Sequence, residues 1–134
     1  MTETIAPSIA PPSPARAGEP HVNAALDRIV GEAGWLTPSQ FAEVILRAGI
    51  VGVRDSIDEG PVGLWVIDRL QAEGIDARAY AGMSTITVYG PRGGRLVVLG
   101  QVRIPDGHTM DALEREVTDG EWPELVRGGY DDER

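Results

Sequence analysis

Two runs of apolar residues at helical spacing occupy the early part of the chain. The first run follows Asn23, which can cap a helix, and stops at Gly34. The second run follows the segment LTPSQF, in which Thr37 fits an N-cap, Pro38 the first helical position and Gln40 the last member of a capping box. The pattern therefore predicts two helices joined by a short connection.

In the middle of the chain the pattern changes from helix to strand. Residues 61–73 form the most apolar helical run, and we expect this helix at the centre of the domain. Alternating apolar and polar residues then predict the strands Ile75–Ala81, Ser84–Tyr89 and Arg95–Ile104, and Thr109 can cap a last helix. The expected fold class is α+β, with three N-terminal helices, a three-stranded antiparallel β-meander and a C-terminal helix (ααα-βββ-α).

The second and third predicted strands fit together if Gly90–Gly94 is a five-residue hairpin loop. Tyr89 then lies opposite Arg95, and alternation gives the sheet one apolar face. The predicted core face comprises Ala77, Ala79, Ile86, Val88, Leu96, Val98, Val102 and Ile104. The opposite face, with the loop residue Arg92, is the candidate interaction face: Arg78, Tyr80, Thr87, Tyr89, Arg92, Arg95, Val97, Leu99 and Arg103.

Charge is unevenly distributed along the chain, which has a net charge of −9. The segment Ala77–Pro105 contains four arginines and no Asp or Glu, so it carries +4 and the remainder carries −13. A net negative charge argues against a duplex-binding protein, because phosphate contacts supply most of that affinity. The predicted domain therefore sets an arginine–tyrosine sheet face against an acidic helical body.

Composition divides the chain into one domain and two tails. Residues 1–20 contain five prolines and are predicted to form a disordered Pro-rich arm, residues 21–128 a single α+β domain, and residues 129–134 an acidic tail. The first residues lack the basic start and apolar core of a signal peptide, and no run reaches the ~18 apolar residues of a membrane helix. We expect a cytoplasmic protein with no membrane partner.

Two residue types that are missing from the chain exclude several chemistries. Cysteine is absent, which rules out disulfides, thiolate nucleophiles and Cys-ligated metals. All twelve basic residues are arginine, so a P-loop or a Schiff-base lysine is excluded as well. The bias towards Ala, Gly and Arg is typical of a GC-rich genome and suggests an actinobacterial or bacteriophage origin.

The remaining candidates for chemistry are weak. His21 and His108 have no partner at metal-ligand spacing, so we expect solvated histidines. Asp55–Gly60 resembles the start of an EF-hand loop, but Ile57 and Val66 occupy positions that need oxygen ligands. No two carboxylates are recognisably paired in an apolar setting. The sequence therefore predicts no enzyme, no cofactor and no metal.

Two motifs carry a resemblance to a known group of proteins. Pro61-Val62 opens an apolar helix, and after the strands comes the tail segment DGEWPEL, Asp119–Leu125. Together they resemble small actinobacterial or actinophage proteins. The resemblance implies an α+β fold and carries no activity with it.

Three functions are compatible with these features. The first is a protein-interaction or self-assembly module that uses the candidate interaction face, because Tyr and Arg are enriched at interface cores. The second is a nucleic-acid-binding accessory or regulatory protein, since aromatic side chains on a basic sheet can stack unpaired bases. The third is an acidic DNA mimic. The expected partner is a protein or a second copy of the chain, with nucleic acid as the alternative.

Overall fold

The computed structural model describes residues 18–53, 59–82 and 84–127. Its α-helices are α1 (Pro20–Gly34), α2 (Pro38–Arg47), α3 (Pro61–Ala72) and α4 (Thr109–Thr118), and Pro123–Leu125 forms the short 3₁₀ helix η2. Most of the expected arm, the whole acidic tail and most of Asp55–Gly60 lie outside the described residues. Gly18–Pro20 are described, so the folded region extends into the last residues of the expected arm.

The main sheet is antiparallel and three-stranded, in the order β2-β3-β4. Its strands are β2 (Arg78–Gly82), β3 (Thr85–Arg92) and β4 (Arg95–Arg103). A second, parallel pair joins β1 (Gly52–Val53) to β5 (Val126–Arg127), which brings the segment after α2 beside the end of the described chain. The α+β class is confirmed, but the order ααα-βββ-α is wrong because β1 lies between α2 and α3 and β5 follows α4.

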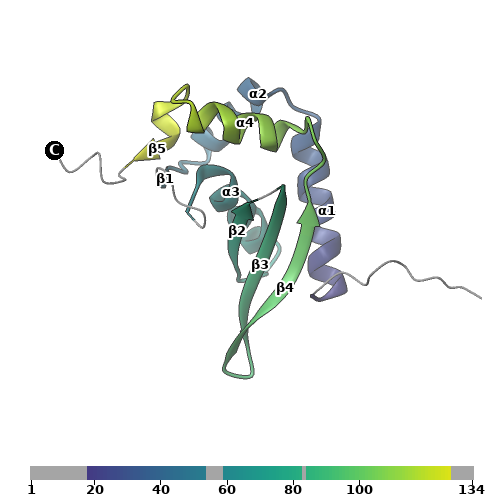
Figure 1. Ribbon diagram of the computed structural model, residues 1–134. Coiled ribbons are helices and arrows are strands. Elements are labelled where there is room, and N and C mark those ends of the chain that lie inside the picture. Colours follow the sequence, from purple (N-terminus) through teal and green to yellow (C-terminus); the bar gives the residue numbers. More distant parts are fainter. Residues whose placement is uncertain (1–17, 54–58, 83, 128–134) are drawn as a thin grey trace, which may run out of the picture.

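The helices lie on one side of the sheet. Figure 1 shows α1 alongside β4, α3 behind β2 and β3, and α4 across one end of the sheet, while the tip of the β3–β4 hairpin extends at the opposite end. The core between these layers includes Leu26, Phe41, Leu70, Ile86 and Leu113, all at most 2% exposed. Phe41 and Trp65 meet edge to face, with ring centroids 4.8 Å apart.

Close approach of α3 to β2 depends on small residues. A Cβ added at Gly63 would lie 3.9 Å from the Ala79 Cβ, so the space between helix and strand has room for no more than one methyl group at this point. Ala77 and Ala79 are buried at 6% and 0% exposure. Larger side chains at these positions would push the helix away from the sheet.

The capping predictions succeed at α2 and fail at the other two tested helices. At α2, Thr37 Oγ1 accepts from the Gln40 backbone N–H at 3.1 Å and Gln40 Oε1 accepts from the Thr37 N–H at 3.0 Å, which completes the capping box. Helix α1 begins at Pro20 with Glu19 as its N-cap, so Asn23 is inside the helix. Helix α4 is capped by His108, and Thr109 is its first residue.

His108 is a structural residue and not the solvated histidine expected from the sequence. Its Nδ1 accepts from the Met110 backbone N–H at 3.0 Å, and its Nε2 lies 3.0 Å from the Val30 carbonyl oxygen. Because Nδ1 accepts, Nε2 carries the proton and donates to Val30. Gly34 permits this approach, since a Cβ there would lie 2.9 Å from the imidazole. His108 therefore ties the start of α4 to the end of α1.

Register in the sheet differs from the prediction at both turns. With Gly82-Met83 as the turn, the sequence pattern predicts Ala79 opposite Ile86. In the structure Ala79 pairs with Val88 and Ala81 with Ile86, a shift of two residues that keeps every side chain on its predicted face. The β3–β4 hairpin closes at the pair Arg92–Arg95, so its loop has two residues and not five. Those two, Gly93 and Gly94, have φ of 60° and 78°, the left-handed conformations that a tight hairpin turn needs.

A β-bulge then divides β4 into two parts. Tyr89 pairs with Val98, but its neighbour Val88 pairs with Gly100, so Leu99 is an extra residue in the strand. Alternation is interrupted there: Val98 points outward, whereas Leu99 and Gly100 are both buried. The predicted core positions Leu96 and Val98 are wrong, with 65% and 41% exposure, and the predicted outer residue Leu99 is fully buried.

Candidate functional site

The outer face of the main sheet is the candidate functional site. Buried and exposed residues alternate along β2 and β3, and the buried set faces the helices. No helix in the described ranges packs on the other side (Figure 1). With the observed register, the outer face comprises Arg78, Tyr80, Thr85, Thr87, Tyr89, Pro91, Leu96, Val98, Gln101 and Arg103.

Apolar side chains on the outer face are unusually accessible. Tyr80, Leu96 and Val98 are 44%, 65% and 41% exposed. Val98 stands directly opposite Tyr89, and Tyr89 stands opposite Arg78, so one cross-strand row joins an aliphatic, an aromatic and a cationic side chain. The face therefore has an apolar strip where solvent exposure alone would favour polar residues.

A row of polar side chains crosses the sheet next to this strip. Tyr80, Thr87 and Gln101 are cross-strand partners, and the Gln101 Nε2 donates to Thr87 Oγ1 at 3.3 Å. Arg103 lies beyond them, opposite Thr85. The hydrogen bond holds the Gln101 side chain against Thr87, so the polar part of the face is partly pre-organised.

Five of the nine predicted face residues lie on the outer face: Arg78, Tyr80, Thr87, Tyr89 and Arg103. Arg95 is exposed at the hairpin turn, but it pairs directly with Arg92 and therefore lies on the other face. Leu99 is buried because of the bulge, and Val97 faces inward, opposite Gly90, where it packs against the core. Leu96 and Val98 lie on the outer face instead of Val97 and Leu99. Arg92 points to the helix side of the sheet, where it binds Glu19.

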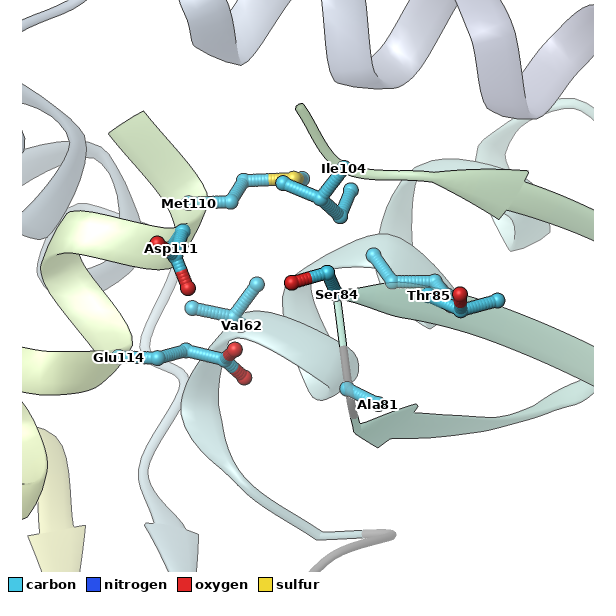
Figure 2. Close-up of a pocket in the computed structure, with 9 residues that line it drawn as sticks. Val62, Ala81, Ser84, Thr85, Ile104, Met110, Asp111 and Glu114 are labelled. Atoms are coloured by element: carbon cyan, nitrogen blue, oxygen red, sulfur yellow. The ribbon is translucent and has the colours of Figure 1, made fainter. Parts of the chain in front are cut away.

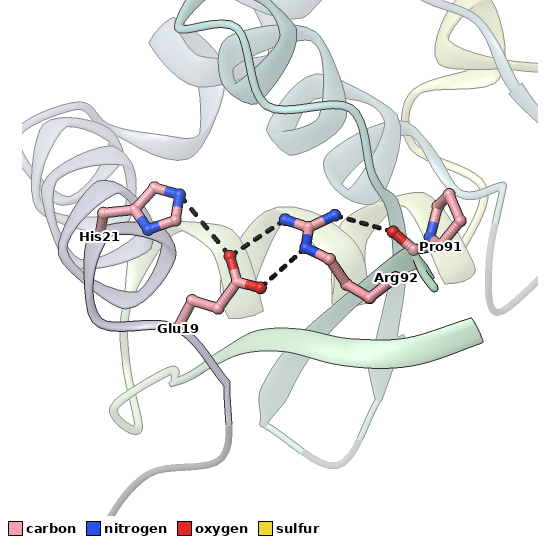
Figure 3. Close-up of polar contacts among 4 residues, drawn as sticks. All are labelled: Glu19, His21, Pro91 and Arg92. Carbon is pink, nitrogen blue, oxygen red and sulfur yellow. Dashed lines mark hydrogen bonds and ion pairs between the residues drawn. The ribbon is translucent and has the colours of Figure 1, made fainter. Parts of the chain in front are cut away.

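Arg92 joins the hairpin tip to the start of α1. Its Nε and one terminal nitrogen donate to the two carboxylate oxygens of Glu19 at 2.9 and 3.0 Å, and the other terminal nitrogen donates to the Pro91 carbonyl at 2.8 Å (Figure 3). The hydrogen bonds from Arg92 lower the pKa of Glu19 below its usual value, with a smaller opposing contribution from desolvation. His21 lies 3.7 Å from the same carboxylate. A bidentate pair of this kind fixes the position of the guanidinium.

A groove of about 280 Å³ lies beside this pair. It is formed by the first turn of α1, the loop between α3 and β2, and the end of β3, with His21, Ile75, Asp76, Pro91 and Arg92 among its lining residues. The lining combines apolar, cationic and anionic groups. Sequence reasoning did not find this groove, because its residues come from three separate segments.

A second pocket brings two carboxylates together, contrary to the expectation from the sequence. Asp111 and Glu114 on α4 face Ser84 and the apolar residues Val62 and Ile104 (Figure 2). Burial raises the pKa of Glu114 to about 7, and the neighbouring charge of Asp111 adds to the effect. The i, i+3 spacing on an amphipathic helix was the signal that could have predicted this pair.

The size and partners of this second pocket limit its chemistry. Its volume is about 10 Å³, the room that a single water requires. Asp111 is also engaged by Arg115, whose terminal nitrogen lies 2.8 Å from the Asp111 carboxylate. A carboxyl group that titrates near neutrality can act as a general acid, but a pocket of this volume does not hold a substrate. Among the described residues, no group of three His, Cys, Asp or Glu is arranged to hold a metal ion.

Comparisons with protein-family models, with curated proteins and with solved structures found no match to this chain. Within the described ranges, the helices are too short and too polar for any of them to cross a membrane.

Proposed function

We propose that this chain is a non-enzymatic protein-interaction module that binds an acidic protein partner through the outer face of its three-stranded sheet. The observation that best supports the proposal is that Leu96 and Val98, neighbours on β4, and Tyr80 on β2 are exposed on one face that no described helix covers. Exposed apolar side chains that gather in one patch are characteristic of interaction surfaces.

The side chains around the patch favour an acidic partner. Arg78 and Arg103 lie on the same face, and the segment that forms the sheet contains no Asp or Glu. Tyr and Arg are the residues most often found at interface hot spots, because they combine apolar area with directed polar groups. Opposite charge on the partner would steer its approach and reject basic proteins.

The dimensions of the face indicate a small interface. Strands about 4.8 Å apart, with a rise of about 3.3 Å per residue, give this three-stranded face an area of roughly 400 Å². Two such surfaces in contact fall in the range of transient complexes. We therefore expect rapid exchange and an affinity that decreases as the ionic strength rises.

A matched pair of variants tests the proposal. Val98 and Val51 are 41% and 40% exposed, but only Val98 lies on the outer face. The full chain, V98E and V51E would each be immobilised, and the proteins that they retain would be quantified and then purified for titration. V98E should lose at least tenfold in affinity for the partner of the full chain, whereas V51E should keep it. Equal binding by V98E, with an unchanged circular dichroism spectrum, would contradict the proposal.

Nucleic-acid binding is the alternative use of the same face. Tyr80 and Tyr89 share the outer face with Arg78 and Arg103, and this arrangement supports stacking of unpaired bases next to phosphate contacts. This alternative predicts that a labelled single-stranded oligonucleotide binds at low salt, that salt weakens binding steeply, and that Y80A weakens it at every salt concentration. A flat anisotropy titration at low salt would exclude it.

An acidic DNA mimic receives less support from the contacts of the helices. A mimic needs free carboxylates along one surface, but three carboxylates on or beside the described helices are ion-paired within the domain. These pairs are Glu73 with Arg28, Glu32 with Arg69 and Asp111 with Arg115.

A further inference from the structure

Trp35 is the most exposed large apolar side chain among the described residues, at 88%. It is the C-cap of α1, and its backbone N–H bonds to the Glu32 and Ala33 carbonyl oxygens. A Cβ at the preceding Gly34 would lie 2.9 Å from the His108 ring, so the ring packs closely against this part of the backbone. The backbone is therefore held while the indole is exposed, and Trp35 is a pre-positioned side chain that no residue of the described ranges covers. Tryptophan in such a position has the properties of an interface anchor.

The groove beside Arg92 lies at the other end of the same helix. His21, in the first turn of α1, is one of its lining residues, and Trp35 follows the last residue of α1. A helix of 15 residues is about 22 Å long, so the indole cannot reach the groove of its own molecule. Figure 1 shows the two ends of α1 at opposite ends of the domain.

The chemistry of the groove suits an indole ring. All three nitrogens of the Arg92 guanidinium donate within its plane to Glu19 and Pro91, which leaves the flat faces of the group available for stacking. Tryptophan is the best partner for such a cation–π contact. Ile75 and Pro91 supply apolar walls, and Asp76 offers a carboxylate to accept the indole N–H. The volume of about 280 Å³ is just below the ~300 Å³ where small-ligand pockets begin, which suits one bulky side chain.

We propose that the groove binds Trp35 of a second copy of this chain, so that copies associate head to tail. The contact is heterologous, because one molecule contributes the tryptophan and the next contributes the groove. Each added copy presents a new Trp35 and a new groove, so assembly continues into a chain or closes into a ring. The contact uses none of the exposed apolar residues Tyr80, Leu96 and Val98, and it shares only Pro91 with the outer sheet face.

Association should increase with protein concentration and should shift the tryptophan emission to shorter wavelength. Trp65 is 5% exposed, and the Trp122 indole donates to Glu116 at 2.9 Å, so a blue shift of emission on concentrating the full chain reports burial of Trp35. Light scattering should show a mass that rises above the monomer over the same range. W35A should remain monomeric, whereas V51A, which also shortens an exposed apolar side chain, should assemble like the full chain.

A mixing experiment distinguishes head-to-tail contact from any symmetric dimer. D76R places a long side chain in the groove and keeps Trp35, whereas W35A keeps the groove and lacks the tryptophan. Each variant alone should be a monomer, and an equimolar mixture should give a dimer of one W35A and one D76R molecule and nothing larger. D68R introduces the same charge change at an exposed position of α3 outside the groove and should assemble normally.

Three results would overturn the proposal. One is a full chain that stays monomeric, with unchanged emission, up to millimolar concentration. Another is assembly by W35A to the same extent as the full chain. The last is a mixture of W35A and D76R that contains monomers only, although circular dichroism shows both to be folded and the full chain assembles.

Discussion

Two leucines on β4, only three residues apart, have opposite environments. Leu96 is 65% exposed on the outer face near the hairpin turn, and Leu99 is fully buried on the helix side. Strict alternation places residues three apart on opposite faces, and the sequence pattern accordingly predicted Leu96 in the core and Leu99 on the outer face. The structure has the reverse. The length of the turn and the presence of a bulge therefore decide which of the two leucines is buried.

The bulge is stabilised by the start of α1. The Glu19 backbone N–H donates to the Leu99 carbonyl at 2.8 Å, and Asn23 Oδ1 accepts from the Gln101 N–H at 2.8 Å. These bonds satisfy groups along the edge of β4 that a neighbouring strand would otherwise satisfy. Gly100 has no side chain where Val22 and Leu26 come close, since a Cβ there would be 2.7 Å from Val22. The irregularity of β4 is thus what allows α1 to pack against it.

The largest predicted effect is the difference between the two leucines. L99A should lower the free energy of unfolding by about 2–5 kcal/mol, because it opens a cavity between β4 and the helices. L96A should change it by no more than about 0.5 kcal/mol, because the side chain is in solvent. Urea denaturation of the two variants checks this directly. If L96A were the more damaging variant, the five-residue loop would be the correct register.

Elements with strong local signals were predictable from the sequence. The capping box at Thr37 and the proline at the start of α3 depend on neighbouring residues only, and both helices begin where expected. The hairpin also had such a signal, since Gly93-Gly94 between two strands is typical of a two-residue turn. Strands β1 and β5, of two residues each, carry too little pattern to be recognised.

The candidate site was predictable only as far as side-chain alternation holds. Tyr80, Thr87 and Tyr89 lie before the bulge in chain order and were placed correctly. Val97 and Leu99 were not, because a bulge depends on contacts with α1 that are distant in sequence. The groove beside Arg92 was beyond local reasoning for the same reason. A carboxyl group on α4, in the small pocket beside the sheet, was missed as well, although its i, i+3 spacing from a second carboxylate was a usable signal.

That carboxyl group, Glu114, gives the second prediction. Its pKa is raised to about 7 by burial and by Asp111, so the folded protein binds this proton more tightly than the unfolded chain does. The stabilising effect is complete below about pH 4.5 and is lost as the pH rises through about 7. At ~1.4 kcal/mol per unit of pKa, a rise from 4.5 to about 7 corresponds to a loss of roughly 3–4 kcal/mol. E114Q should therefore be more stable than the parent chain by about that amount at pH 8 and similar to it at pH 4.

Denaturation of E114Q and the parent chain across this pH range is the measurement. E43Q, which removes a charge from an exposed position of α2, is the control for net charge and should show little difference at either pH. A constant gap between E114Q and the parent chain from pH 4 to pH 8 would mean that Glu114 is not desolvated in the folded state.

Asn23 links the two parts of β4 to α1 and provides an effect of intermediate size. N23A removes the acceptor of the Gln101 N–H, which then lies part-buried without that bond, at a cost of about 1–3 kcal/mol. In N23A the Gln101 amide should exchange its hydrogen faster than in the parent chain. The amides of the distant Thr37 capping box should exchange at nearly unchanged rates. Unaltered protection of Gln101 in N23A would show that Asn23 does not hold the edge of β4.

The smallest effect is expected at the exposed hairpin tip, where Arg92 bonds Glu19. The pKa of Glu19 is lowered, so its ionised form favours the folded state, and this contribution is lost as the pH falls through the lowered pKa. Both groups are accessible to solvent, so salt screens the pair. E19Q and R92A should each destabilise slightly at pH 7 and low salt, and their difference from the parent chain should vanish at low pH or in 1 M salt. Because the two residues act on each other, the double variant should lose no more than the larger single variant, which a double-mutant cycle measures. A larger loss in the double variant would mean that Arg92 supports the tip through contacts other than Glu19.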